Sequence, residues 1–450
     1  MTTGAAAAAD VAVVGAGVSG LAAATEAARL GLEVLCLDAA DSPGGCIRTL
    51  RKDGFLFELG PNTVLDNAPE LSLLVEAAGL GGSRIEASPL SRNRFVVKRG
   101  KLVPLPMSPP ALVASPLFSL GAKLRILREP WVKPAPAEKE ETIAEFTRRR
   151  LGPEILEFAV QPFVSGVYAG DPDRLSVRHA LPKLAALERE HGSLIRGAIR
   201  KRSGPAPKAR IVSFRSGLDA LPRALAEKLG PRFRPGALVR RVERGADGGF
   251  AISLEGGETF AARRVVVALP PAAAARVVEA EEAPALATVP AASVAVVSLG
   301  YRRESVRHPL DGFGFLAPRS EKRNVLGCLF PSSLFPGRAP AGCVALSAFV
   351  GGALRPDLAE KGEREIEAIA REEVEDLLDA RGEPVVAHVA RWPRAIPQYE
   401  IGHGAVLERA ARIEAALPGL RFAGNWLRGI SVGDCARNAF RVAAEIAAGT

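Results

Sequence analysis

Residues 11–24 read VAVVGAGVSGLAAA, and this stretch decides the fold of the first part of the chain. Its first four residues are apolar and predict a buried strand, which is followed by glycines in the pattern G-x-G-x-x-G. The alanines beyond them predict a helix that runs to Arg29, and residues 33–37 predict a second buried strand. Together they form a β-α-β unit, so we expect an α/β fold with a Rossmann-type dinucleotide-binding domain.

The glycine turn predicts a site for a pyrophosphate. Glycines allow a tight turn and a close backbone approach, while the N–H groups at the start of the helix meet the negative charge. An acidic residue at the end of the second strand would accept hydrogen bonds from a ribose hydroxyl, and an arginine there would instead indicate NADP. The ligand is therefore FAD or NAD. The expected contacts are Gly15, Gly17, Val18, Ser19, Gly20 and Asp38.

Further glycines favour FAD over NAD. A Gly-Gly pair follows the acid, and the segment ELGPN (58–62) comes after the pair. An NAD dehydrogenase does not need these elements, whereas an extended flavin dinucleotide needs backbone wrapped closely along it. The contacts expected there are Gly44, Gly45, Gly60, Pro61 and Asn62.

The C-terminal segment predicts a second approach to the cofactor. Residues 420–423 predict a strand, and a glycine loop from Gly424 to Asp434 leads into a helix. Such a turn could bring N–H groups to an anionic acceptor, such as the ring oxygen of a reduced flavin. An ordinary strand-to-helix turn is the alternative interpretation.

Composition narrows the class of protein. The 450 residues are 48% hydrophobic, which predicts two or three domains, and the net charge is +9. This charge would attract anionic lipid or an acidic substrate, although a solvated arginine-rich surface explains it equally well. No nucleic-acid motif, metal-ligand spacing or nucleophile motif is present in the sequence. Five scattered cysteines and the absence of a signal pattern indicate a cytoplasmic protein.

Seven separated strings make the chain similar to the oxygen-dependent protoporphyrinogen oxidases, a family within the flavin amine oxidases. The similarity covers nearly the whole length, and the order and spacing of the strings agree. Besides residues 11–24, they are FELGPN (57–62), RNRFVV (92–97), SGVYAGD (165–171), DGFGFL (311–316), IPQY (396–399) with Gly402-His403, and GDC (433–435).

The resemblance implies an FAD-binding domain assembled from separated segments, a β-rich substrate domain and a helical insertion. The FAD-binding domain and the substrate domain therefore each take more than one range of the chain. We assign 1–88, 211–285 and 396–450 to the FAD-binding domain, 89–105 and 286–395 to the substrate domain, and 106–210 to the insertion.

The resemblance also implies the reaction. A porphyrinogen would undergo three two-electron oxidations at the flavin, with molecular oxygen as acceptor and hydrogen peroxide as product. Because the flavin carries the chemistry, we expect no catalytic acid or base. Oxidation of coproporphyrinogen, a polyamine or a carotenoid remains open, as does a non-catalytic lipid-binding escort role. The sequence leaves both a monomer and a homodimer open.

The resemblance assigns roles to individual residues. Arg94 would pair with a propionate of the tetrapyrrole, and Gly166 would approach its reacting edge. Apolar walls are expected at Phe313, Leu329 and Phe349. The backbone of Val239 would meet the adenine end of FAD, and the flavin would lie over the turn that contains Gly424, Val432, Gly433 and Asp434. The simpler alternatives are a solvated arginine and ordinary core residues.

Two departures from the family pattern stand out. Ser42-Pro43 replaces the arginine that usually precedes the paired glycines, which puts one phosphate or ribose contact in doubt. Ser216-Gly217 stands where relatives often have two glycines. Neither change removes a reacting group.

Residues 102–131 predict a surface that lies on a membrane. Prolines interrupt the segment, so short helices and loops are expected in place of one amphipathic helix. Packing against the protein's own core is the alternative. On the membrane hypothesis the protein is peripheral on the inner face of the cell membrane. Apolar contact would come from Leu105, Met107, Leu112, Val113, Leu117 and Phe118, and contact with anionic headgroups from Lys123, Arg125 and Arg128.

Overall fold

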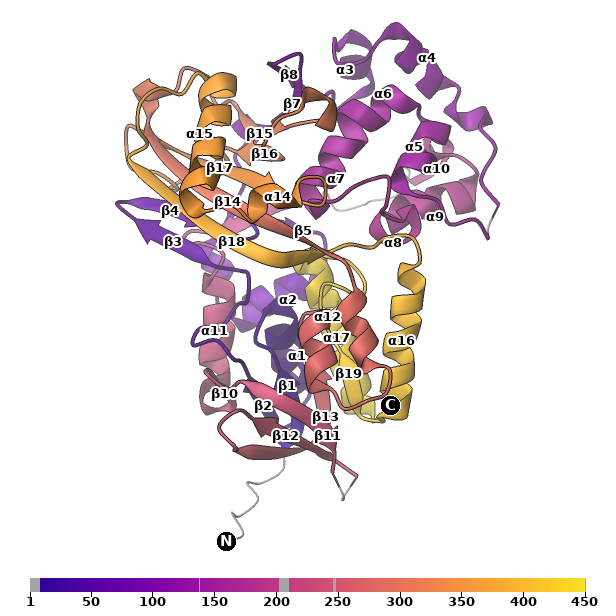
Figure 1. Ribbon diagram of the computed structural model, residues 1–450, viewed down its shortest axis with the longest axis vertical. Coiled ribbons are helices and arrows are strands. Elements are labelled where there is room, and N and C mark those ends of the chain that lie inside the picture. The colour runs from indigo at the N-terminus through magenta and orange to yellow at the C-terminus, as the bar shows by residue number, and fades with distance from the viewer. Residues whose placement is uncertain (1–8, 137, 202–209, 246–247, 450) are drawn as a thin grey trace.

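A computed structural model describes residues 9–136, 138–201, 210–245 and 248–449. Two seven-stranded sheets and a group of helices form its main parts (Figure 1). The first sheet has the order β10-β2-β1-β13-β12-β11, with β19 paired to β13. Its strands are β1 (Ala9–Val14), β2 (Val34–Leu37), β10 (Phe233–Arg234), β11 (Val239–Arg244), β12 (Phe250–Leu254), β13 (Thr259–Val267) and β19 (Leu420–Phe422).

Both faces of the first sheet are covered where its central strands are apolar, at residues 11–14 of β1 and 265–267 of β13. Val11 and Val13 of β1 pack under α1 (Val18–Arg29), α2 (Pro69–Ala77), α11 (Ala220–Leu229) and α17 (Val432–Ala448). Ala12 and Val14 face the opposite side, toward α12 (Pro271–Val277), η6 (Ala283–Thr288) and α16 (His403–Ala416). The predicted α/β class with a Rossmann-type domain is confirmed.

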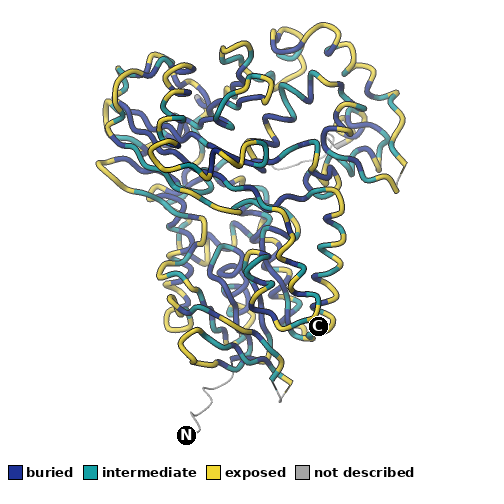
Figure 2. The backbone as a smooth tube through the Cα atoms, in the orientation of Figure 1, coloured by how far each residue is buried: buried dark blue, intermediate teal, exposed yellow. Residues whose placement is uncertain are grey.

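The second sheet is mostly antiparallel, with the order β18-β14-β17-β16-β15-β7-β8. One face packs against the 16-residue helix α15 (Glu363–Leu378), and Figure 2 shows the buried interior that results. The strands are β7 (Asn93–Lys98), β8 (Lys101–Pro104), β14 (Ala291–Arg302), β15 (Gly312–Leu316), β16 (Gly327–Leu329), β17 (Cys343–Gly351) and β18 (Val386–Pro397). The helices beside them are α13 (Pro331–Leu334), α14 (Pro356–Ala359), η7 (Arg303–Ser305) and η8 (Arg319–Glu321).

Two small sheets join the main parts. One pairs β3 (Thr49–Lys52) with β4 (Phe55–Glu58), and the other has the order β5 (Val64–Asp66), β9 (Arg210–Phe214) and β6 (Arg84–Glu86). Short 3-10 helices connect these regions at η1 (Gly81–Ser83), η2 (Pro89–Ser91) and η5 (Gly230–Arg232).

The helical insertion occupies the upper right of Figure 1. It contains α3 (Pro109–Ala114), α4 (Leu120–Leu127), η3 (Glu129–Trp131), α5 (Ile143–Arg150), α6 (Pro153–Ile155), the π-helix η4 (Leu156–Val160), α7 (Gln161–Tyr168), α8 (Val177–Ala180), α9 (Pro182–His191) and α10 (Leu194–Lys201). A capping box with the local pattern Thr-x-x-Glu opens α5, because Thr142 and Glu145 form reciprocal side-chain-to-backbone hydrogen bonds.

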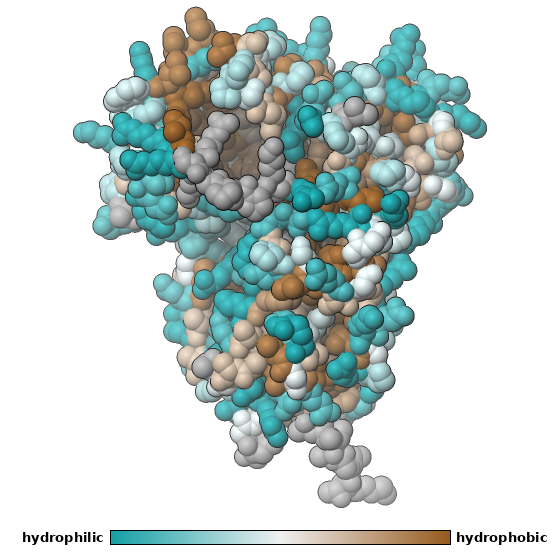
Figure 3. Space-filling view, turned by 180° about the vertical axis from the view of Figure 1, so that it is seen from behind, coloured by the Kyte–Doolittle hydropathy of each residue, from teal (hydrophilic) through white to brown (hydrophobic). Residues whose placement is uncertain are grey.

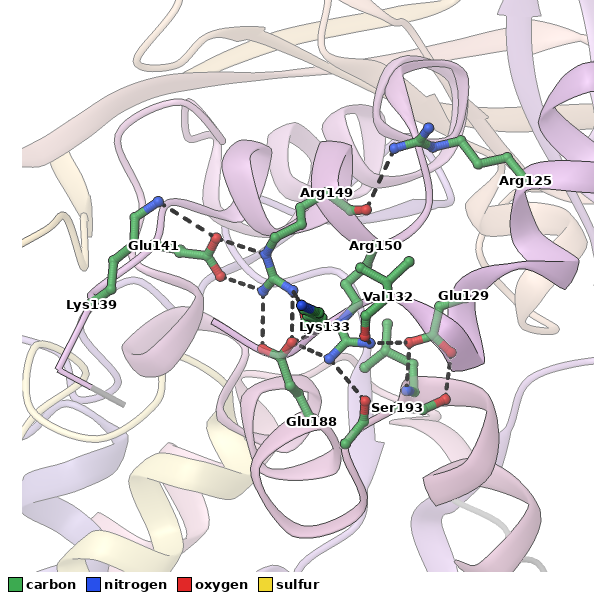
Figure 4. Close-up of polar contacts among 12 residues, drawn as sticks. Arg125, Glu129, Val132, Lys133, Lys139, Glu141, Arg149, Arg150, Glu188 and Ser193 are labelled. Carbon is green, nitrogen blue, oxygen red and sulfur yellow. Dashed lines mark hydrogen bonds and ion pairs between the residues drawn. The ribbon is translucent and has the colours of Figure 1, made fainter. Parts of the chain in front are cut away.

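A buried ion-pair network holds the insertion together (Figure 4). Arg150 and Glu129 have fully buried side chains and lie 3.0 Å apart, and Arg150 also pairs with Glu188 of α9. Glu129 accepts hydrogen bonds from the Ser193 hydroxyl and from the N–H of Leu194, so it caps the start of α10. Arg150 of α5 therefore contacts η3 and α9, and Glu129 of η3 connects this network to α10.

The burial of residues 102–131 corrects part of the membrane prediction. Leu117 and Phe118 are buried, because they pack with Val96 of β7 inside the protein. Leu105 and Leu112 are partly buried against the same cluster. Met107 and Val113 are exposed, as expected. Among the described residues, no helix combines the length and apolar character needed to span a bilayer.

Candidate flavin and substrate site

Three parallel strands of the first sheet end side by side. β1 pairs with β13, and β13 pairs with β19, all in parallel. The N–H of Ala268 donates to Val14 O at 2.8 Å, and the N–H of Ala423 donates to Val267 O at 3.0 Å. The turns that follow these strands therefore meet at one edge, which is where open α/β sheets bind their ligands.

The glycine turn at this edge leaves room for a ligand where the sequence predicted it. Gly15 has φ +105°, and a Cβ there would lie 2.7 Å from Ala268 O. A Cβ on Gly20 would overlap the carbonyl oxygen of Gly15. Gly17 differs, because a Cβ there would meet no protein atom within 4 Å. Helix α1 begins at the next residue, Val18, without a side-chain cap. Open space in front of uncapped N–H groups fits a pyrophosphate.

Asp38 is held at the end of β2, beside this turn. Its carboxylate accepts hydrogen bonds from the N–H groups of Ala16 and Ala40. A carboxylate has about four acceptor positions, so capacity remains for ribose hydroxyls. The carbonyl of Asp38 accepts from the N–H of Ala237 at 2.7 Å, which brings the start of β11 at Val239 alongside.

The Gly44-Gly45 pair packs directly on the first turn. The N–H of Gly44 donates to Ala16 O at 2.8 Å, and a Cβ on Gly45 would lie 3.4 Å from the Cα of Gly17. Both have positive φ angles, +112° and +59°, which favour glycine. Gly60 of the following loop touches Cys46, because a Cβ there would overlap the carbonyl oxygen of Cys46. Pro61 and Asn62 follow in that loop, where the amide of Asn62 donates to Gly60 O at 3.0 Å.

Arg48 is a residue that our sequence interpretation missed. Its Nε donates to Gly45 O at 3.0 Å, and its Nη1 donates to the Ser42 hydroxyl at 2.8 Å. A guanidinium therefore lies beside the Ser42-Pro43 departure and can supply positive charge near the expected phosphates. A basic residue three positions after a glycine pair was the available signal.

The C-terminal turn brings a buried oxygen without a partner to the same region. Gly424 and Ser431 bound a loop that ends at the N-terminus of α17, whose cap is the Ser431 hydroxyl. A Cβ on Gly433 would lie 2.9 Å from Asn67 Oδ1, a buried atom without a hydrogen-bond partner. A ligand group that donates a hydrogen bond would satisfy this oxygen.

Val432 and Asp434, two further predicted residues of this turn, make contacts within the protein. Val432 opens α17 and packs with Ala16 and Leu21 in the core of the FAD-binding part. Asp434 accepts from the Ser431 hydroxyl at 2.6 Å and pairs with Arg437 at 2.8 Å. Its carboxylate therefore stabilises the turn.

The predicted substrate residues share one face of the second sheet. Arg94 of β7 and Leu329 of β16 both pair with Gly314 of β15, so they lie in one row across the strands. Leu329 and Phe349 are half-buried, whereas Cys328 and Ala348 next to them are buried under α15. Because side chains alternate along a strand, Leu329 and Phe349 point away from α15.

Phe313 and Arg94 form a direct contact. The Cζ of Arg94 lies 5.1 Å from the ring centroid of Phe313, and a register shift between Gly312 and Gly314 locally turns the strand that carries this ring. Burial lowers the pKa of Arg94. Among the residues that the structure describes, no carboxylate forms an ion pair with Arg94. A half-buried guanidinium beside an apolar ring suits a carboxylate carried by a flat apolar ligand.

Helix α7 approaches the same sheet through Gly166. A Cβ on Gly166 would lie 2.6 Å from Leu316 Cδ2 of β15. Phe163 and Val167 lie four residues apart on α7, so they share one face of the helix, and they remain 47% and 42% exposed. We did not predict these two residues, although their spacing was the available signal. Figure 3 shows a hollow with apolar walls on this side of the molecule.

Comparisons with known proteins agree with this geometry. The family model for flavin containing amine oxidoreductases matches residues 18–447. The chloroplastic protoporphyrinogen oxidase of Nicotiana tabacum is 35% identical over 97% of this chain and 85% of its own length. The coproporphyrinogen III oxidase of Bacillus subtilis (strain 168) is 29% identical over 94% of this chain and 95% of its own length.

A solved structure shares the fold along the whole chain. It is a crystal structure from Exiguobacterium sp. 255-15, assigned as a protoporphyrinogen oxidase, with 25% identity and a TM-score of 0.84. The match covers 99% of this chain and 100% of the other. The glycine turn leaves room for a dinucleotide, the carboxylate of Asp38 is held beside it, and the matching family model is one of flavin-containing enzymes. FAD is therefore the cofactor. The chain belongs to the flavin-containing amine oxidoreductase family, in its protoporphyrinogen oxidase branch.

Proposed function

We propose that this protein oxidises protoporphyrinogen IX to protoporphyrin IX, with oxygen as electron acceptor and hydrogen peroxide as product. The observation that carries the proposal is Arg94, a half-buried guanidinium without a carboxylate partner among the described residues, next to the ring of Phe313. FAD supplies hydride acceptance and electron transfer to oxygen when it is bound.

The residues of this chain bind and orient the substrate. Arg94 would pair with a propionate through two parallel hydrogen bonds, which fixes the rotation of the macrocycle in its plane. Leu329 and Phe349 offer apolar surface on the same face of the sheet, and this surface suits the flat ring and excludes water. Gly166 has no side chain, so α7 can pack closely against Leu316 of β15 beside this surface.

Coproporphyrinogen III is the second candidate, because the Bacillus subtilis relative carries that name. A coproporphyrinogen has more propionates than a protoporphyrinogen, so it would need more cationic partners than Arg94 alone. The higher identity of the Nicotiana tabacum protein supports protoporphyrinogen.

A side-by-side assay tests both candidates. Purified protein with the visible absorption of bound flavin would be given each porphyrinogen under air, and porphyrin fluorescence and peroxide would be followed. We expect a larger kcat/KM for protoporphyrinogen, with three peroxides per porphyrin. A larger value for coproporphyrinogen would select the second candidate, and a flavin-loaded protein that oxidises neither would contradict both.

We also propose that the insertion rests on an anionic membrane, which would place the protein at the inner face of the cell membrane. Exposed apolar side chains gather at the outer corner of the insertion (Figure 3). We call them the α3–α4 patch, and Arg128 beside them is exposed as well. The patch consists of Met107, Val113, Leu120, Leu124, Leu127 and Trp131, whose exposed fractions range from 51% to 75%.

Co-sedimentation with vesicles that contain anionic lipid tests the membrane proposal. We expect wild type to bind, with binding that weakens as salt rises, and the double variant Leu120→Asp with Leu124→Asp to stay in the supernatant. The matched control is Leu30→Asp with Val385→Asp, which alters two exposed apolar residues outside the patch. Wild type that fails to bind at low salt would contradict the proposal.

A further inference from the structure

One tyrosine hydroxyl connects both ends of the loop that precedes α17. Tyr399 is 1% exposed and follows strand β18. Its hydroxyl donates a hydrogen bond to the carbonyl of Asn425 and accepts one from the N–H of Gly429, at 2.9 Å. The five-residue loop 425–429 is thereby closed by a single side-chain group.

Two other contacts hold the same loop. The indole N–H of Trp426 donates to Leu269 O at 3.1 Å, and the amide of Asn438 donates to Arg428 O at 2.8 Å. The loop leads directly to Ser431, which caps the end of α17 where Gly433 lies beside the unpartnered oxygen of Asn67. The position of this end of α17 therefore depends on the 425–429 loop.

The segment around Tyr399 also holds the substrate side. The N–H of Ser176 donates to Tyr399 O at 2.8 Å, and the amide of Gln398 donates to Tyr168 O at 2.9 Å. Tyr168 is the last residue of α7, the helix that carries Gly166. One short segment thus contacts both the loop of the cofactor edge and the helix of the substrate face.

The surroundings of the hydroxyl keep it neutral. Burial raises the pKa of Tyr399, so the phenol stays protonated and can donate. Its ring stacks on His403, with centroids 4.3 Å apart. Burial, followed by the nearby His179, lowers the pKa of His403 to about 4. The stacked pair is therefore uncharged at neutral pH.

We propose that Tyr399 is a positioning residue for FAD, which holds the 425–429 loop so that the N-terminus of α17 meets the bound flavin. The proposal rests on the flavin-dependent function above and adds a residue that is not among the expected FAD contacts. A loop ordered before binding loses less conformational entropy when the ligand binds, so the hydroxyl should strengthen FAD binding.

Tyr168 provides a matched control. Both tyrosines are buried, and the Tyr168 hydroxyl donates to the carbonyl of Ala180, at 2.7 Å, within the insertion. Tyr399→Phe and Tyr168→Phe each remove one buried hydroxyl and keep the ring. Only the first variant releases the 425–429 loop.

The experiment measures FAD release from the purified holoenzymes by the recovery of flavin fluorescence after dilution. We expect Tyr399→Phe to release FAD at least about tenfold faster than wild type, because two loop groups lose their partner. Tyr168→Phe should release FAD at the wild-type rate, although both variants melt at lower temperature. Hydrogen exchange at residues 425–429 should rise in Tyr399→Phe alone.

Two results would overturn the proposal: wild-type FAD release in Tyr399→Phe, or equal acceleration in Tyr168→Phe. If Tyr399→Phe does not fold, Asn438→Ala removes another anchor of the 425–429 loop. It should also accelerate FAD release and raise hydrogen exchange at residues 425–429. No porphyrinogen enters this measurement. A failure of the proposed oxidation would therefore leave its result unchanged.

Discussion

The guanidinium of Arg94 lies over the ring of Phe313, with Cζ 5.1 Å from the ring centroid, and no carboxylate of the described residues pairs with it. Replacing it with alanine should therefore remove a substrate contact without disturbing an internal ion pair. We expect Arg94→Ala to raise KM and to lower kcat/KM. The loss of transition-state stabilisation should be about 1.5–3 kcal/mol, the usual strength of a hydrogen bond to a charged group.

FAD content is the control for this prediction, because Arg94 lies on the second sheet, away from the glycine turns of the first. It should equal that of wild type. Arg94→Lys keeps the charge and loses the bidentate geometry, so its KM should lie between those of wild type and Arg94→Ala. An unchanged KM in Arg94→Ala would make Arg94 a solvated surface residue.

Gly17 and Gly20 should respond differently to valine, although both belong to the same motif. A side chain at Gly17 would enter space that no protein atom occupies, and the φ of −67° suits any residue. Gly17→Val should therefore fold with nearly wild-type circular dichroism and purify without flavin. Gly20→Val should fail to fold, because its Cβ would overlap Gly15 O. Stoichiometric FAD in Gly17→Val would refute the assignment of the pyrophosphate site.

Glu58 should make stability depend on pH. Burial raises the pKa of Glu58 to about 7, against opposing hydrogen bonds from the Thr49 hydroxyl and the Leu218 N–H. Between pH 4.5, its ordinary pKa, and 7 the folded state holds a proton that the unfolded state has lost. The free energy of unfolding should therefore fall as pH rises through this range, by up to about 3 kcal/mol, and level off above it.

Urea unfolding of wild type and Glu58→Gln from pH 4.5 to 8 measures this effect. The variant cannot ionise, so the difference between the two proteins should shrink with rising pH and can change sign. Glu76→Gln removes an exposed carboxylate and controls for the loss of one charge. A constant difference between wild type and Glu58→Gln over the whole range would show that Glu58 titrates normally.

Arg150 should matter far more for stability than Arg148 on the same helix. The Arg150 side chain is fully buried between Glu129 and Glu188, so Arg150→Met leaves the buried carboxylate of Glu129 without its cationic partner and should cost about 3–5 kcal/mol. Arg148 is 44% exposed and pairs with Asp173 at 2.9 Å, so Arg148→Met should cost at most about 1 kcal/mol. Chemical denaturation compares the two, and equal losses would contradict the role of the network.

The parts of the fold that were predictable depend on local patterns. The first strand, glycine turn and helix follow one another in sequence, so β1, α1 and β2 appear with only small changes at their ends. The capping box at Thr142 is equally local. The burial of Leu117 was not predictable, because it depends on contacts with Val96 in a distant strand.

The site shows the same division. The glycines and Asp38 carry a motif, whereas Phe163 and Val167 carry none and become visible only when α7 is placed against β15. The role of Tyr399 required knowledge of which carbonyl and which N–H face its hydroxyl. Tertiary placement decides such contacts, and a single sequence records them only weakly.

The edge where β1, β13 and β19 meet has a consequence for biosynthesis. Residues 14, 267 and 422 end these three strands, so the parts of the cofactor edge are synthesised hundreds of residues apart. A nascent chain can form the β1-α1-β2 unit early, yet the edge is incomplete until β19 and α17 have been synthesised. We therefore expect polypeptides that stop before β19 to fail to retain flavin.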